Sequence, residues 1–130
     1  MLISLFSIPV LSSEFNTPVP YREEGKCGYS DRNMNIVIKP EYDACGDMID
    51  GMASVMKNGK YGFIDSTGKK IVLPVHTYSS SINKGHAIIG LDNRYAVINS
   101  KGDAVIPFTS YYISSYNDGA AVVSENYKYG

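Results

Sequence analysis

Residues 51–75 read GMASVMKNGKYGFIDSTGKKIVLPV, and this stretch decides the fold of the chain. Three short runs of strand-forming residues alternate in it with two glycine-containing turns. The first turn is Asn58-Gly59. An Asn-Gly pair between alternating apolar runs favours a tight β-hairpin, because both residues tolerate positive φ. The stretch therefore predicts a unit of three short antiparallel strands.

The same unit recurs along the chain with a period of 34 residues. Several residue types return at this step: Gly51, Gly85 and Gly119; Ala53, Ala87 and Ala121; Tyr61, Tyr95 and Tyr129. A fixed period in this range is the signature of a repeat architecture. We therefore predict an all-β tandem array of three-stranded units, arranged as an open, solenoid-like stack or as a partial propeller-like one.

Two details of the repeat carry structural expectations. The alanine that recurs indicates that another element approaches closely there, so Ala87 is expected in a tight contact between units. The third unit has one residue fewer after Gly102, so that its proline is Pro107 and not the residue that the period predicts. The equally spaced glycines are expected in matching turns that begin equivalent strands.

The period divides the chain into units that form one structural domain. Residues 25–58, 59–92 and 93–126 are the full units, 1–24 is a degenerate or partial unit, and 127–130 begins a truncated one. Partial units at both ends are expected to expose strand edges with unpaired backbone groups. The N-terminal segment, further repeat units or a second copy of the chain could cover these edges, and we favour further repeat units of a longer array.

Three segments carry a family resemblance: GKYGFIDSTGKKIVLP, RYAVINSKGDAVIP and KPEYDACGDMIDGMASV. They resemble the bacterial WG-repeat (KWG) pattern, over about residue 25 to the end. The chain departs from this pattern in having no Trp, with Tyr61 where the family often has one, and in having Ala96 where a Gly is usual. The family's Tyr-Asp pair is intact only at Tyr42-Asp43. The resemblance implies a β-rich repeat array, often attached to other bacterial domains, and no catalytic residues.

Composition argues against nucleic acid and membrane surfaces as partners. The 130 residues carry a net charge of −1, whereas a general nucleic-acid or membrane-surface binder needs a basic excess. The apolar run at residues 2–11 is too short to span a bilayer. It is either an export signal or the tail of a preceding unit. We favour the second reading, and with it the cytoplasm, with export as the alternative.

Cys27 and Cys45 are the two cysteines of the chain. They occupy non-equivalent repeat positions and lack metal-ligand spacing. We expect each to be a small buried or half-buried apolar residue. The alternative is a disulfide between them, which is possible only in an oxidising compartment.

A basic residue recurs just before the repeated aromatic position, as Lys26, Lys60, Arg94 and Lys128. Stacked units would place these cations in a row that could hold an acidic partner. The simpler interpretation is that they are solvated hairpin ends that discourage aggregation through strand edges.

Tyrosines are concentrated in the connectors between units, at Tyr78, Tyr111 and Tyr112 among other positions. A tyrosine has an apolar ring and a polar tip, which suits both a binding surface and the core of a small β array. For the row that begins with Tyr61 we favour the core, and for Tyr111 and Tyr112 both alternatives remain.

Nothing in the sequence points to catalysis. His76 and His86 lack ligand spacing, no serine has the context of a nucleophile elbow, and every glycine is accounted for by a turn. We therefore predict no enzyme, no cofactor and no metal site. The favoured hypothesis is a module that binds a protein or another polymer through its connectors, with Lys60, Arg94, Lys128, Tyr78, Tyr111 and Tyr112 as candidate contacts. The alternative is a structural spacer that supports a neighbouring domain.

Overall fold

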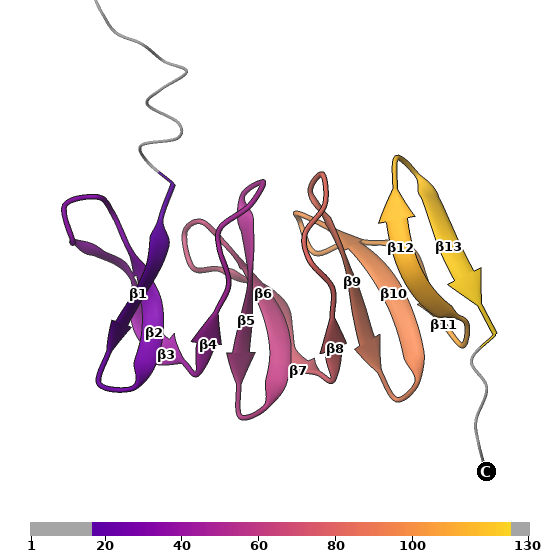
Figure 1. Cartoon of the computed structure of the whole chain (residues 1–130), viewed down its shortest axis with the longest axis horizontal. Coiled ribbons are helices and arrows are strands. Elements are labelled where there is room, and N and C mark those ends of the chain that lie inside the picture. Colours follow the sequence, from indigo (N-terminus) through magenta and orange to yellow (C-terminus); the bar gives the residue numbers. More distant parts are fainter. Residues whose placement is uncertain (1–16, 126–130) are drawn as a thin grey trace, which may run out of the picture.

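The computed structural model describes residues 17–125, which form four antiparallel sheets that follow one another along a single axis (Figure 1). The regular secondary structure in this range consists of strands alone, with no helix. The predicted all-β tandem array is therefore confirmed, and its sheets form an open row. The apolar run near the start of the chain and the truncated last unit lie outside the described residues.

The second sheet shows the plan of the unit. Its strands are β4 (Ala44–Cys45), β5 (Met52–Lys57), β6 (Lys60–Asp65) and β7 (Lys70–His76), paired in that order. The last three are the strands expected from the sequence. β4 comes from the connector between units, so the unit contains one more strand than the three predicted.

The other sheets repeat this plan with differences at the two ends. The third sheet pairs β8, β9, β10 and β11, the first pairs β1, β2 and β3, and the last described sheet pairs β12 and β13. Their bounds are β1 Val19–Glu23, β2 Lys26–Ser30, β3 Ile36–Tyr42, β8 Tyr78–Ser79, β9 His86–Leu91, β10 Arg94–Asn99, β11 Ala104–Thr109, β12 Tyr112–Asn117 and β13 Ala120–Ser124.

Turn chemistry explains where the strands end. In the β5–β6 hairpin, Asn58 and Gly59 have φ values of 53° and 78°, as a type I′ turn requires. Equivalent turns close the β1–β2 and β9–β10 hairpins, and these turns lie along the lower edge of the array in Figure 1. At the upper edge, Gly51 follows Asp50 in a second turn with positive φ, which Gly85 and Gly119 repeat. The expectation of matching turns at these glycines is confirmed.

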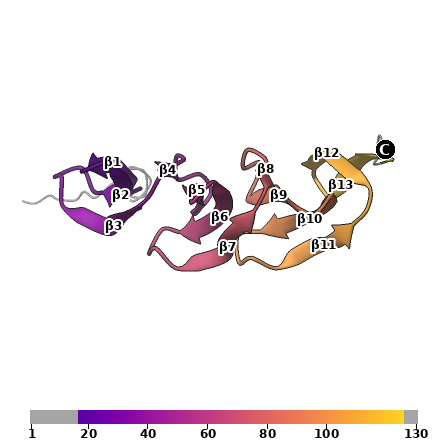
Figure 2. The same cartoon turned by 90° about the horizontal axis from the view of Figure 1, so that it is seen from below.

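The third strand of each unit is bulged. Tyr61 pairs with His76 and Phe63 pairs with Val72, so three residues of β7 lie opposite the single residue Gly62. The bulge of β3 opposite Gly28 has the same size. In β11 only two residues lie opposite Ala96, because this strand is one residue shorter. Figure 2 shows β3, β7 and β11 on one face of the array, with β4, β8 and β12 on the opposite face.

The core consists of separate clusters between successive sheets. Ala53, Val55 and Ile64 of the second sheet pack against the first sheet, whereas Met52, Phe63 and Val72 pack against the third. Because both faces of a sheet are covered, its strands are apolar on both sides. Ala87 is 2 % exposed and lies in the cluster between the second and third sheets. This confirms its expected place in a contact between units.

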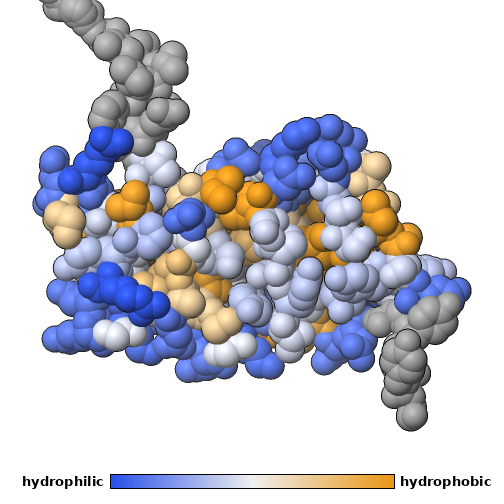
Figure 3. Space-filling view, viewed as in Figure 1, coloured by the Kyte–Doolittle hydropathy of each residue, from blue (hydrophilic) through white to orange (hydrophobic). Residues whose placement is uncertain are grey.

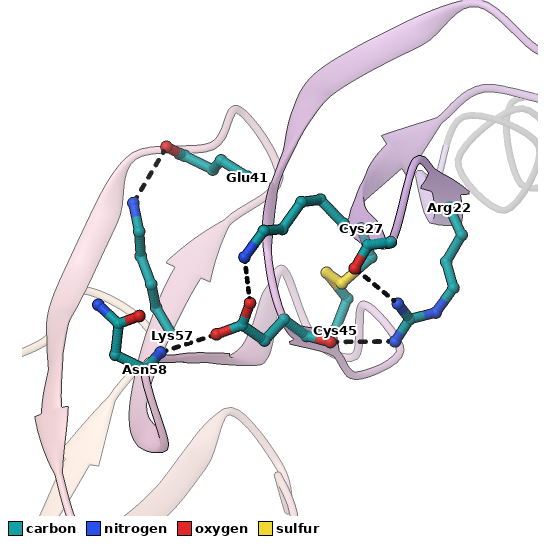
Figure 4. Close-up of polar contacts among 9 residues, drawn as sticks. Arg22, Cys27, Glu41, Cys45, Lys57 and Asn58 are labelled. Carbon is teal, nitrogen blue, oxygen red and sulfur yellow. Dashed lines mark hydrogen bonds and ion pairs between the residues drawn. A yellow bond between two sulfur atoms is a disulfide. The ribbon is translucent and has the colours of Figure 1, made fainter.

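A disulfide joins the first sheet to the second. Cys27 of β2 and Cys45 of β4 are bonded, and their Cα atoms lie 6.1 Å apart (Figure 4). Cys27 is buried and Cys45 is half-buried, as expected, but the preference for two unpaired cysteines was wrong. The error follows from the unexpected strand, because β4 pairs with β5 and thereby carries Cys45 to the sheet of the preceding unit.

Candidate functional site

The recurring cations lie at the lower edge of the array in Figure 1. Lys26, Lys60 and Arg94 are the first residues of β2, β6 and β10, immediately after the type I′ turns, and all three are exposed. The hairpins therefore place them at equivalent positions in successive sheets. Lys128 lies outside the described residues.

In the first unit, the cation has an internal partner. Lys26 forms an ion pair and hydrogen bond with Asp43, and the second carboxylate oxygen of Asp43 accepts a hydrogen bond from the backbone N–H of Asn58 at 2.8 Å (Figure 4). The hydrogen bond from Lys26 and then the one from Asn58 lower the pKa of Asp43 below its usual value. One carboxylate thus bridges the hairpin ends of two successive units.

In the second unit, this internal partner is missing. The residue one period after Asp43 is Thr77, whose hydroxyl donates to the backbone oxygen of Gly90 at 3.3 Å. The corresponding stretch of the third unit, residues 109–111, contains no acidic residue. Within residues 17–125, Lys60 and Arg94 form no ion pair.

Each of these two cations lines a shallow pocket. The pocket at Lys60 has a volume of about 380 Å³ and is also lined by Lys57, Asn58, Pro74 and Val75. The pocket at Arg94 has a volume of about 200 Å³, and its other lining residues are Leu91, Asp92 and Phe108. The two sets occupy equivalent repeat positions, so successive units build the same kind of pocket from a hairpin end and the bulged third strand.

Apolar side chains form part of the wall of both pockets. Val75 is 48 % exposed and Phe108 is 38 % exposed, and each follows the proline of its bulge. The Phe108 ring stacks on His76, with ring centroids 6.0 Å apart. Figure 3 shows the wider distribution on the face in view, where hydrophilic residues gather at the upper and lower edges and apolar residues lie between them.

The candidate tyrosines divide into a cluster and a single exposed residue. Tyr78 and Tyr112 both pack edge-to-face against Tyr95, with ring centroids 5.6 and 5.1 Å away. Burial and the neighbouring Tyr112 raise the pKa of Tyr78. Tyr111 does not join this cluster and is 51 % exposed. Tyr61, like Tyr95, is half-buried.

Sequence reasoning missed one further pocket, which lies between the connectors of the second and third units. It has a volume of about 200 Å³ and is lined by Ser80, Ser81, Asn83, His86, Ala87, Ile88, Ser114, Ser115 and Tyr116. The only sequence signal was that Ser80 and Ser81 recur one period later. Ser80 has a structural role, because its hydroxyl accepts from the Ile88 N–H at 2.8 Å and donates to the Ser81 carbonyl at 2.9 Å.

The described residues offer neither a metal-ligand cluster nor a membrane-spanning helix. Residues 17–125 contain no group of three or more His, Cys, Asp and Glu side chains that could hold a metal ion. The same range has no helix with the length and apolar character needed to cross a membrane.

Comparison with known proteins identifies the family of the repeat. The model of the WG containing repeat matches residues 28–61, 61–95 and 95–129 in succession. No curated protein and no solved structure matches the chain. These matches cover most of the sequence and follow the period that the sheets display, so the chain belongs to the WG containing repeat family.

Proposed function

We propose that this chain is a non-catalytic binding module, which holds a protein partner along the two pockets at Lys60 and Arg94. The observation that supports this proposal is the repetition of one pocket, with an unpaired cation on one side and an exposed apolar side chain on the other. Repeat arrays present extended binding surfaces because each unit offers the same patch at a fixed offset. The alternative, a spacer, needs neither feature.

The apolar walls give the sharpest test. A lysate of the organism that makes the chain is passed over the immobilised protein and over a variant with Val75→Ser and Phe108→Ser. The control variant carries Val37→Ser and Val105→Ser, which change side chains of the same kind and similar exposure on β3 and β11. We expect a defined protein to be retained by the wild type and the control and lost from the pocket variant.

Two results contradict the proposal. Equal retention of the same proteins by the pocket variant places binding elsewhere on the surface. Failure of the wild type to retain any protein that withstands washing favours the spacer. Circular dichroism of all three proteins shows whether a loss of binding comes from a loss of fold.

A further inference from the structure

We infer that Lys60 and Arg94, which line the two pockets, take the carboxylates of an extended acidic peptide, as Lys26 takes that of Asp43 in the first unit. The inference rests on the proposed function and names the chemistry of the partner. Its starting point is that the fold already binds one carboxylate at this repeat position. Asp43 lies between the ammonium group of Lys26 and the N–H of Asn58, and so joins two hairpin ends.

The second unit keeps the donors of this arrangement and replaces the acceptor. Lys60 corresponds to Lys26, and the N–H of Asp92 corresponds to that of Asn58. Neither of these donors has a hydrogen-bond acceptor within residues 17–125, because Thr77 stands where the first unit has Asp43. A carboxylate supplied by another molecule would restore the pattern that the first unit completes by itself.

The charges around the two pockets favour an acidic ligand most strongly at Lys60. Lys57 and Lys60 line this pocket, and Glu41 is shared between Lys57 at 3.8 Å and Lys70 at 3.5 Å. At the other pocket, Asp92 offsets part of the charge of Arg94. We therefore expect the pocket at Lys60 to contribute more of the binding energy.

The pocket walls and the overall charge define the rest of the ligand. Pro74, Val75 and Phe108 offer apolar surface next to the cations, which suits a peptide in which acidic and apolar residues alternate. Such a segment alternates its side chains between two faces when it is extended. Nucleic acid fits less well, because its phosphates call for a dense basic surface and the chain has a net charge of −1.

The test measures binding of a labelled synthetic peptide in which Glu alternates with Leu. Its counterpart has Gln in place of every Glu, and single-stranded DNA serves as a second polyanion. We expect the Glu peptide to bind the wild-type chain, with affinity that falls as salt is added. We expect roughly tenfold weaker binding by a variant with Lys60→Gln and Arg94→Gln.

Three further variants test whether the peptide binds at this site or responds only to the net charge of the chain. Lys69→Gln with Lys101→Gln changes the net charge by the same amount in exposed turns outside the pockets, and should leave binding unchanged. Thr77→Asp keeps both pocket cations and supplies the internal acceptor that the first unit has. It should weaken binding of the Glu peptide, whereas Thr77→Asn should not.

Each other outcome overturns the inference. Equal binding of the Gln peptide removes the need for a carboxylate, and tighter binding of DNA identifies a phosphate ligand. Equal affinity of the Glu peptide for the wild type and for the variant with Lys60→Gln and Arg94→Gln places the ligand elsewhere. If the peptide does not bind, yet the Val75 and Phe108 variant loses its retained protein, the inference fails while the proposed function stands.

Discussion

Gly62 and Ala96 occupy the same repeat position, and the difference between them follows from the strand that lies opposite. A Cβ atom on Gly62 would lie 2.6 Å from the carbonyl oxygen of Val72 and 2.7 Å from the nitrogen of Pro74. Ala96 carries its Cβ atom where the bulge has two residues and not three. The alanine at position 96 and the missing residue before Pro107 therefore belong together, because the shorter bulge accommodates the alanine side chain.

We predict that Gly62→Ala destabilises the protein by about 3 kcal/mol, because the added methyl group meets backbone that cannot move independently. This outweighs the gain of roughly 0.5–1 kcal/mol from removing a glycine from a strand. Urea unfolding measures the difference. Gly59→Asn is the control, since Asn93 stands at the equivalent turn position with φ 60°, and should change stability by less than about 0.5 kcal/mol.

Deleting Leu73 should restore much of the stability of the Gly62→Ala variant. Leu73 is 60 % exposed and is the residue that has no counterpart in β11. If the deletion lowers the stability of Gly62→Ala further, bulge length does not explain why Ala96 is accommodated.

The roles of single residues could be predicted where they follow the period, and not where they depend on a neighbouring unit. The positive φ values at Asn58 and Gly59 follow from local turn chemistry. The pairing of Cys27 with Cys45 was missed because it depends on which strand of one unit contacts the next. The ion pair of Lys26 with Asp43 was missed because it joins two residues 17 positions apart within one unit, which the 34-residue period does not relate.

At the scale of elements, the three strands expected in each unit were predictable. The strands in the connectors were not, with two residues each in β4 and β8 and six in β12. β5, β6 and β7 alternate apolar residues between recognisable turns, and this pattern identifies a strand by itself. β4 and β8 have two residues each, too few for any alternation to show. They are strands only because β5 and β9 lie beside them.

The disulfide holds the connector strand of the second unit to the first unit, and we predict that it contributes about 3 kcal/mol to stability. Closing a loop of this length, with a sequence separation of 18 residues, removes conformational entropy from the unfolded chain. Urea unfolding of the variant with Cys27→Ala and Cys45→Ala measures the loss. Reduction with dithiothreitol should lower the stability of the wild type similarly and leave that of the variant unchanged.

Thiol titration of the purified, oxidised protein is the independent control for this bond. We expect no reactive thiol in the unfolded, unreduced chain. Two free thiols per chain would contradict the disulfide. A disulfide in the purified protein would agree with folding in an oxidising compartment.

At the scale of the whole molecule, stability depends on contacts between neighbouring sheets. Each cluster of the core joins one sheet to the next, so no single unit buries its own apolar faces. In such an array, stability is approximately a sum of unit terms and interface terms. The 34-residue period allowed this architecture to be predicted, whereas the pockets depend on how a hairpin end and a bulge meet.

We predict that Ala87→Leu destabilises the protein by about 1–3 kcal/mol, because the larger side chain overpacks the interface with Met52 and Phe63. Thermal unfolding measures the effect. Ala104→Leu is the matched control, because Ala104 is exposed in β11 and should tolerate the change. An unchanged melting temperature for Ala87→Leu would refute tight packing at this interface.

In the proposed binding mode, the repetition of the pocket has a consequence for selectivity. A ligand held at Lys60 would reach Arg94 as an intramolecular step, and the effective concentration of its second acidic residue would then govern the overall avidity. Because the sheets fix the distance between the two cations, a peptide whose carboxylates cannot span that distance engages only one pocket. Individually weak contacts would thereby select partners by the spacing of their acidic residues, so that the array acts as a molecular ruler.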